Sequence, residues 1–183
     1  MDLVTHDVHK FFTMLLKRNG YVLEQLYSPL IIHTTPEHAE LKQVASGCIT
    51  RHHSHHYLGF AQTQWDLLNK EHPPRIKPLL YVYRVILTGI HLMRTGRIEA
   101  NLLRLNEEFK LPYVQDLVAR KQSGTEKGAL RENELALHQA VYVRLIAMLE
   151  AEAANTGLPS EPSGRETLND LLVRIRFSHG TVA

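Results

Sequence analysis

The sequence contains 183 residues, of which 44% are hydrophobic and 22% are charged. This is the composition of a folded globular protein, and a chain of this length buries roughly 70% of its unfolded surface, which excludes a disordered protein. Lys and Arg total 21 against 19 Asp and Glu, so the net charge of +2 does not by itself indicate a nucleic-acid binder. Twelve histidines leave room for a local phosphate site.

Hydrophobic residues recur at helical spacing over most of the chain, so the expected fold is mainly α, an irregular bundle of about six to eight helices. Thr5 is expected to cap the first helix, and Asn19-Gly20 to end it in a left-handed conformation. The helix that Gly96 closes is apolar nearly all round, which is typical of a central helix. The predicted helices span residues 5–18, 21–27, 36–45, 49–70, 77–95, 111–121, 130–154 and 166–177.

Strand signals are scarce. Residues 2–4 are a candidate remnant strand, and residues 29–33 a second short one. The expected organisation is a helical domain over 1–155, a linker rich in proline and glycine over 156–165, and a C-terminal helix within 166–183 that packs back on the domain.

Cys48 is the single cysteine, which excludes an internal disulfide bond and fits a reducing cytoplasm. A small packed residue is the favoured interpretation of this thiol, rather than a nucleophile. No signal peptide is recognisable, and the longest apolar run, residues 78–93, is too short to span a bilayer and contains Arg84 and His91. We therefore expect a cytoplasmic protein that does not enter a membrane.

A histidine cluster at residues 52–56 is the sharpest local motif. On a helix, His52 and His56 share a face at the spacing by which two imidazoles bind one metal ion. A third ligand has to come from elsewhere, such as His91, His138 or a carboxylate. The metal site is one of three interpretations of this cluster.

Anion binding is the second interpretation. Arg51, His52 and His53 near a helix start would meet the positive end of the helix dipole, which suits a phosphate. The third interpretation is a polar helix face whose imidazoles bond to carboxylates and carbonyls. The residues alone leave these alternatives open.

A basic and phenolic stripe runs along the otherwise apolar helix at 77–95. Lys77, Tyr81 and Arg84 follow each other at intervals of four and three residues, so they lie on one face. An unpaired buried charge is unfavourable, so the stripe needs a partner. That partner is either an internal acid, Asp66 or Glu24, or the phosphate or carboxylate of a ligand.

The motifs of several enzyme classes are absent from the sequence. It contains no phosphate-binding loop that ends in Lys-Ser or Lys-Thr, no dinucleotide fingerprint and no Gly-x-Ser-x-Gly. Among the N-terminal acids, Asp7 is explained by its place in the first turn of a helix, whereas Asp2 is not explained by capping. A lone carboxylate does not hold Mg²⁺ for phosphoryl chemistry, so Asp2 needs further ligands.

Six segments together resemble a known family, in this order along the chain: residues 2–12, 17–30, 52–60, 77–85, 89–96 and 168–174. The sequence is similar to predicted nucleotidyltransferases of the DNA polymerase beta superfamily, of the RNA-repair-pathway type. The resemblance covers essentially the whole chain. It implies transfer of a nucleotidyl group from an NTP to a hydroxyl or phosphate acceptor, on RNA, with two Mg²⁺ ions held by three carboxylates.

The sequence departs from the superfamily pattern, because it contains neither the Gly-Ser loop nor the Asp-x-Asp pair. Asp2 is the position that matches the third carboxylate, so the resemblance implies the C-terminal helical portion of such an enzyme, inactive alone. A stand-alone helical module that binds RNA, a nucleotide or a metal is the alternative.

Within the resemblance, candidate phosphate contacts are Arg51, His52, His53, Lys77, Tyr81 and Arg84. The expected partners are a nucleotide, RNA, and either a second copy or a missing catalytic half that covers the exposed core.

Overall fold

The computed structural model describes residues 4–123, 128–131 and 133–179, and these residues form nine helices. Their sole strand-like pairing is an isolated antiparallel bridge between Arg75 and Ala129. The predicted mainly α fold is confirmed, whereas the predicted strand at 29–33 is wrong. Of the other predicted strand, at residues 2–4, residues 2 and 3 lie outside the described residues. The helices are α1 (Val8–Leu16), α2 (Gly20–Leu26), α3 (Pro36–Ser46), α4 (His53–Lys70), α5 (Ile76–Thr95), α6 (Leu102–Phe109), α7 (Val114–Gln122), α8 (Glu134–Asn155) and α9 (Arg165–His179).

The chain forms two compact units, each with its own core. Unit 1 contains Met1–His53 and Leu158–Ala183, and unit 2 contains Ser54–Gly157. The predicted single domain over 1–155 stays a prediction, because compact units are defined by contacts and not by independent folding.

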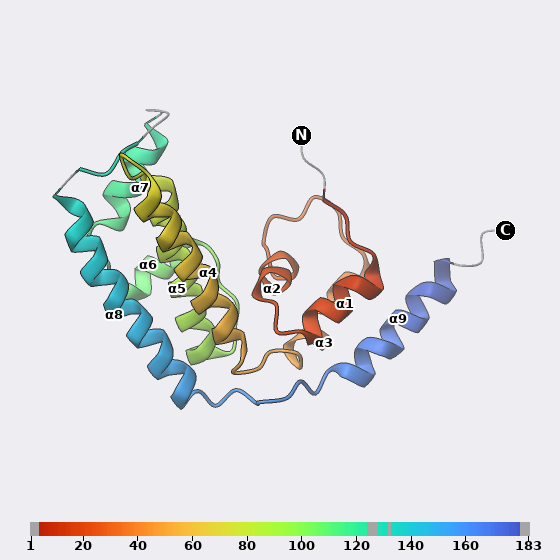
Figure 1. The fold of residues 1–183 in the computed structure, drawn as a ribbon. Coiled ribbons are helices and arrows are strands. Elements are labelled where there is room, and N and C mark those ends of the chain that lie inside the picture. The colour runs from red at the N-terminus through yellow and green to blue at the C-terminus, as the bar shows by residue number, and fades with distance from the viewer. Residues whose placement is uncertain (1–3, 124–127, 132, 180–183) are drawn as a thin grey trace. The chain divides into compact units, whose positions relative to one another are not determined.

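Unit 1 brings the two ends of the chain together, since α9 packs on α3 and α1 (Figure 1). Its return segment is fixed by backbone bonds: the N–H groups of Ser163 and Gly164 donate to the carbonyl of Gly47 at 2.8 and 3.1 Å. An ion pair between Arg174 of α9 and Glu40 of α3 joins the two helices further along. The buried apolar side chains of this unit include Phe12, Leu15, Val22, Leu23, Leu26, Ala45, Cys48, Ile49, Leu168 and Leu171.

The first two helices begin and end differently from the prediction. Asp7 and not Thr5 caps α1, because its carboxylate accepts a bond of 3.1 Å from the N–H of Lys10. The left-handed residue between the helices is Arg18, with φ 62°. Asn19 then caps α2 by accepting from the N–H of Tyr21, so Gly20 begins the second helix instead of ending the first.

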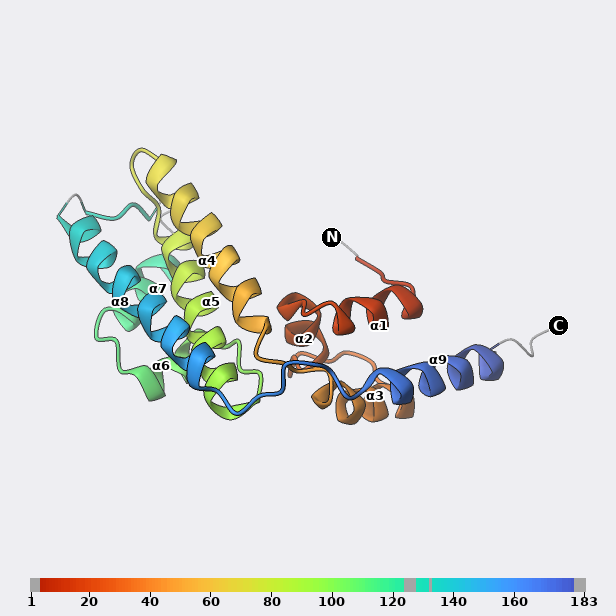
Figure 2. The same ribbon diagram turned by 60° about the horizontal axis from the view of Figure 1, so that its bottom comes forward.

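Unit 2 is built around α5, which contacts α6, α7 and α8. Figures 1 and 2 both show α4, α5 and α8 as long helices lying side by side. Trp65 of α4 stacks on Tyr142 of α8 with ring centroids 4.4 Å apart, and Tyr142 Oη donates to Gln62 at 2.8 Å. The predicted central position of α5 is confirmed, since thirteen of its residues are buried.

The α5 helix is longer than the apolar run that the sequence singled out. It has 20 residues and, among the described residues, is the one helix long and apolar enough to cross a membrane, which corrects the expectation that this segment is too short. Of its most apolar window, 72% is buried inside the protein, as in the core helix of a globular unit. Gly96 ends the helix with φ 68°, a conformation that glycine adopts without strain.

Helix α6 was not among the predicted helices. Its N-cap is Asn101, whose side-chain oxygen accepts from the N–H groups of Leu103 and Arg104 at 2.9 and 3.3 Å. Leu105 is its one fully buried residue, so the helix covers α5 with a narrow apolar stripe. This helix proves important because it forms one wall of the candidate site.

Candidate functional site

The basic and phenolic stripe of α5 lines a surface hollow of about 270 Å³. Lys77, Tyr81 and Arg84 all face it, as their spacing predicted. Leu102 at the start of α6 and Lys121 near the end of α7 complete the polar and apolar walls, together with Leu80. The structure therefore joins three helices of unit 2 around the predicted stripe.

The hollow is cationic. No carboxylate lines it, and neither Lys77 nor Lys121 forms a side-chain hydrogen bond or ion pair with a residue that the structure describes. The guanidinium carbon of Arg84 lies 5.5 Å from the ring centroid of Tyr81, a cation–π distance. Tyr81 is 40% exposed, so its ring remains accessible from the hollow.

Neither internal acid that the sequence offered as a partner lines the hollow. Asp66 accepts a bond of 2.8 Å from the Gln62 amide one turn earlier on α4. Glu24 belongs to α2 of unit 1. For Lys77, the described residues thus provide no internal neutralisation, and a ligand anion remains the open alternative.

Lys121 reaches the hollow because its neighbour Arg120 anchors α7. The Arg120 guanidinium bonds to Glu134 at the start of α8 at 2.8 Å and to the carbonyl of Ala129 at 3.0 Å. Partial burial would raise the pKa of Glu134, but the bonds from Arg120 and the N–H of Arg131 outweigh it and hold the pKa below its ordinary value. The pair therefore stays ionised near neutral pH and fixes the end of α7 beside α5.

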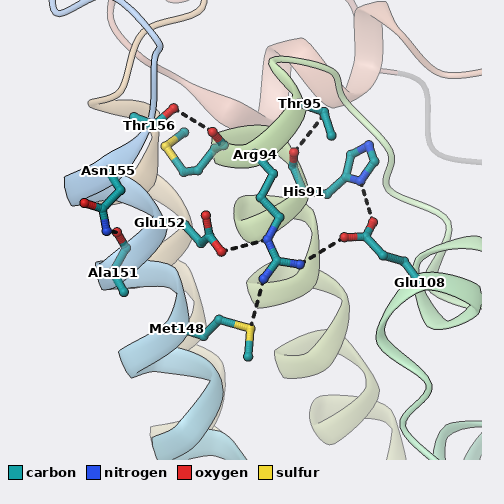
Figure 3. A network of polar contacts seen from close by, with 10 residues as sticks. His91, Arg94, Thr95, Glu108, Met148, Ala151, Glu152, Asn155 and Thr156 are labelled. Atoms are coloured by element: carbon teal, nitrogen blue, oxygen red, sulfur yellow. Dashed lines mark hydrogen bonds and ion pairs between the residues drawn. The ribbon is translucent and has the colours of Figure 1, made fainter.

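A second polar network holds α6 in place (Figure 3). Glu108 of α6 accepts from His91 Nδ1 at 2.9 Å and from Arg94 Nη1 at 3.1 Å, both on α5. Arg94 Nε also donates to Glu152 of α8 at 2.7 Å. Burial alone would raise the pKa of Glu108, but its bonds with His91 and Arg94 lower it on balance. The network thus ties the helix that carries Leu102 to the two longest helices of the unit.

His138 was one candidate third metal ligand, and it is buried in unit 2 instead. Its Nδ1 lies 2.7 Å from Tyr83 Oη, and its ring meets that of Tyr113 edge-on at 5.2 Å. Burial lowers the pKa of His138 and raises the pKa of Tyr83. The pair is therefore neutral in the folded protein near neutral pH.

The histidine cluster lies where α4 begins. His53 is fully buried. Its ring Nδ1 accepts a bond of 3.1 Å from the backbone N–H of Thr50, and its backbone N–H donates to the Thr50 carbonyl at 3.1 Å. This reciprocal pairing resembles a capping box and delays the helix start from the predicted 49 to 53. His52 lies in the preceding turn, and His56 lies in α4 with its ring 5.3 Å from that of Tyr57.

No group of three or more His, Cys, Asp or Glu side chains comes together in the part of the chain that the structure describes. His91 is bonded to Glu108 and His138 to Tyr83, so the two histidines proposed as third ligands have other partners. The metal interpretation of His52 and His56 stays a prediction.

The residues that line the hollow do not include the other predicted phosphate contacts. Arg51 is half-buried in unit 1, where its backbone N–H donates to the Pro159 carbonyl at 2.9 Å. Arg51, His52 and His53 belong to unit 1, whereas Lys77 and the rest of the stripe belong to unit 2. Asp2, the candidate third carboxylate, lies outside the described residues. The phosphate contacts from unit 1 and the role of Asp2 stay predictions.

Leu102 and Lys121 were not among the predicted site residues. Asn101, a good N-cap followed by Leu at intervals, was the signal for α6 and so for Leu102. Lys121 carried no signal of its own, because a lysine in the last turn of a polar helix is ordinary.

Comparison with known proteins identifies the family. The sequence profile described as the RNA repair pathway DNA polymerase beta family matches residues 1–174. The chain belongs to this family. The predicted resemblance is therefore confirmed over nearly the entire sequence.

One relative among the curated proteins is an uncharacterized protein of Methanocaldococcus jannaschii, 27% identical over 165 residues. The matched part makes up 88% of this chain and 66% of that protein, so the chain spans just under two thirds of the length of the relative. No solved structure matches the chain.

Proposed function

We propose that the hollow on α5 binds the phosphates of a nucleotide, as the helical part of an enzyme that transfers a nucleotidyl group from an NTP to RNA. The observation that carries the proposal is the cationic lining: Lys77, Arg84 and Lys121 converge from two helices with no carboxylate among them. Membership of a polymerase-beta family supplies the reaction class. The single cysteine is consistent with action in the cytoplasm.

Each side chain has a distinct task in this proposal. Lys77 and Lys121 are mobile point charges that neutralise phosphate oxygens, whereas the planar guanidinium of Arg84 donates two parallel bonds. The exposed ring of Tyr81 and the side chain of Leu102 offer flat apolar surface to a base or ribose. Binding here orients the triphosphate and compensates its charge.

Two Mg²⁺ ions, if bound by the whole enzyme, would orient the attacking and leaving oxygens in line. The described residues do not fit such a centre, because they bring no three potential ligands together. The 183 residues also contain neither Gly-Ser nor Asp-x-Asp. We therefore assign no chemical step to this chain, and propose that it does not catalyse transfer alone.

Binding of MgATP with a fluorescent ribose label tests the hollow. In the double variant Lys77→Gln/Lys121→Gln we expect the dissociation constant to rise about tenfold or more, because each lost phosphate contact is worth about 1 kcal/mol. Lys70→Gln/Lys110→Gln is the matched control: it removes the same charge from exposed positions of unit 2 outside the hollow and should change affinity by less than about twofold. Equal affinities of both double variants would contradict the proposal.

Incubation of the chain with labelled NTPs, Mg²⁺ and RNA tests the absence of transfer. We expect no incorporation of label. Turnover that survives Asp2→Ala would contradict this part of the proposal and leave nucleotide binding to the α5 hollow to be judged by the affinity measurement.

A further inference from the structure

A groove in unit 1 between α1 and α9 carries a second cationic surface that the proposed function does not use. Its volume is about 300 Å³. Its polar wall consists of His9 and Thr13 from α1, Lys17 at the C-cap of α1, and Arg165 and Asn169 from α9. The buried side chains of Phe12 and Leu168 contribute to an apolar floor. Residues from opposite ends of the chain thus form one surface, which no local sequence motif predicts.

No carboxylate lines this groove either. Lys17 and Arg165 form no side-chain hydrogen bond or ion pair with any residue that the structure describes. Among the acids of unit 1, Glu161 pairs with Arg18 at 3.4 Å, and Asp7 accepts from the N–H of Lys10 and also interacts with His9. Glu166 follows Arg165 on α9 but does not line the groove. Lys17 and Arg165 therefore present positive charge to solvent along the groove.

The length of the polar wall favours an extended anion. His9 in the first turn of α1 and the C-cap residue Lys17 are eight residues apart, which is about 12 Å along the helix axis. Successive phosphates of one strand can contact polar groups spread over this length. Asn169 and Thr13 add uncharged groups of the kind that contact phosphate and ribose oxygens, and the apolar floor suits a base.

We propose that the α1–α9 groove binds the sugar-phosphate backbone of single-stranded RNA. The choice of RNA rests on the proposed function, in which RNA is the acceptor, and on the family description. The groove then serves to hold the acceptor strand, whereas the hollow on α5 holds the nucleotide. The two surfaces have different ligands and are tested with different probes.

Fluorescence anisotropy of a labelled oligouridylate of about a dozen nucleotides tests the groove. In Lys17→Gln/Arg165→Gln we expect affinity to fall about tenfold, and the slope of log K against log salt concentration to become shallower by about 1.4, that is about 0.7 for each lost phosphate contact. The matched control is Lys10→Gln/Arg176→Gln, which removes two charges from the same two helices at exposed positions outside the groove. It should leave the slope unchanged within about 0.3.

Two further variants separate charge from fold. Lys17→Arg/Arg165→Lys keeps the charges and should retain both affinity and slope. Asn169→Asp places an anion in the groove at an exposed position, and should weaken RNA binding even if the double variant melts early. Thermal melting of each variant shows whether unit 1 is intact.

The outcomes distinguish this inference from the proposed function. Equal RNA affinity and salt slope in the groove and control variants would overturn the inference, as would displacement of RNA by oligoglutamate as effective as by unlabelled oligouridylate. Binding of labelled MgATP should be unchanged in all α1 and α9 variants. If the α5 variants lose ATP binding but keep RNA binding at the groove, both the proposed function and the inference are supported. If RNA binding does not depend on the groove residues, only the inference is contradicted.

Discussion

Gly89 illustrates how one position fixes the packing of unit 2. A Cβ atom built there would lie 2.8 Å from the Cβ of Tyr57 on α4 and 3.1 Å from a methyl group of Leu149 on α8. The backbone of α5 can approach both neighbours only because the residue has no side chain. Gly59 on α4 is the contrasting case, since a Cβ there meets nothing within 4 Å.

We expect Gly89→Ala to destabilise the protein by about 1–3 kcal/mol, because the added methyl group forces α4 and α5 apart. Gly59→Ala should stabilise it by about 0.5–1 kcal/mol, since alanine is the better helix former at an open position. Urea unfolding followed by circular dichroism measures both. A Gly89→Ala variant as stable as the parent would show that the helices adjust without cost.

His138 makes stability depend on pH. Burial is the largest effect and lowers its pKa in the folded protein; the charge of Glu134 opposes this shift, and the weaker effect of Arg120 adds to it. The unfolded chain therefore binds the proton more readily, so the contribution of this group is complete above about pH 6.5 and is lost as the pH falls below it.

In His138→Gln we expect a weaker pH dependence of the free energy of unfolding between about pH 7.5 and 5.5 than in the parent protein, because the buried proton acceptor is gone. The comparison removes the contribution of the other histidines, which titrate in both proteins. Parallel pH profiles would mean that His138 takes up its proton without unfolding.

At the scale of helices, α6 depends on polar contacts more than on apolar burial. Arg94 bridges Glu108 and Glu152, and its guanidinium carbon lies 5.4 Å from the ring centroid of Phe109. The Arg94 side chain is 34% exposed, so solvent screening reduces each ion pair, but the network shares one fixed guanidinium among several partners.

We expect Arg94→Gln to destabilise unit 2 by about 1 kcal/mol, and the loss to shrink at high salt. Arg104→Gln is the matched control on α6 itself: its pair with Glu99 is 3.6 Å long and its side chain is 65% exposed, so a change within about 0.5 kcal/mol is expected. Thermal melts at low and high salt separate the two. A salt-independent loss in Arg94→Gln would point to packing against Phe109 instead.

The helices that the sequence predicted well are those whose ends carry local signals. Thr35-Pro36-Glu37 at the start of α3 and Gly96 at the end of α5 act through backbone geometry within a few residues, so pattern analysis finds them. The start of α4 was misplaced because the bonds between Thr50 and His53 use a histidine in place of the usual capping acid. Such substitutions are visible only in three dimensions.

For the candidate site, too, the sequence predicted what depends on a single helix but not what depends on packing between helices. The spacing of Lys77, Tyr81 and Arg84 placed them on one face of α5, which is a property of a single helix. The contributions of Leu102 and Lys121 depend on how α6 and α7 pack against α5. That packing is set by Glu108, Arg120 and their distant partners, which no local pattern relates to each other.

At the scale of the whole molecule, each compact unit has its own buried core, and the single tryptophan, Trp65, lies in unit 2. Its stacking on Tyr142 makes its fluorescence a local reporter of unit 2. Leu145 is buried in this unit, and Leu23 is equally buried in unit 1, so truncating either side chain creates a comparable cavity.

Leu145→Ala should cost about 2–5 kcal/mol and lower the urea midpoint seen by Trp65 fluorescence. Leu23→Ala should lower the midpoint seen by circular dichroism while leaving the fluorescence midpoint within error, because the cavity lies in the other core. Coincident shifts of both signals in both variants would establish that the 183 residues unfold as a single cooperative block.

Cys48 offers the complementary probe. Its thiol is 1% exposed in unit 1, and burial raises the pKa to about 11, so alkylating reagents find almost no reactive thiolate in the native protein. The rate at which this sulfur is alkylated then measures how often the structure around α3 and the return segment opens transiently. RNA bound in the α1–α9 groove should slow the alkylation of Cys48, whereas an ATP analogue bound to α5 should leave the rate unchanged. The reactivity of this native thiol therefore distinguishes between the two bound ligands.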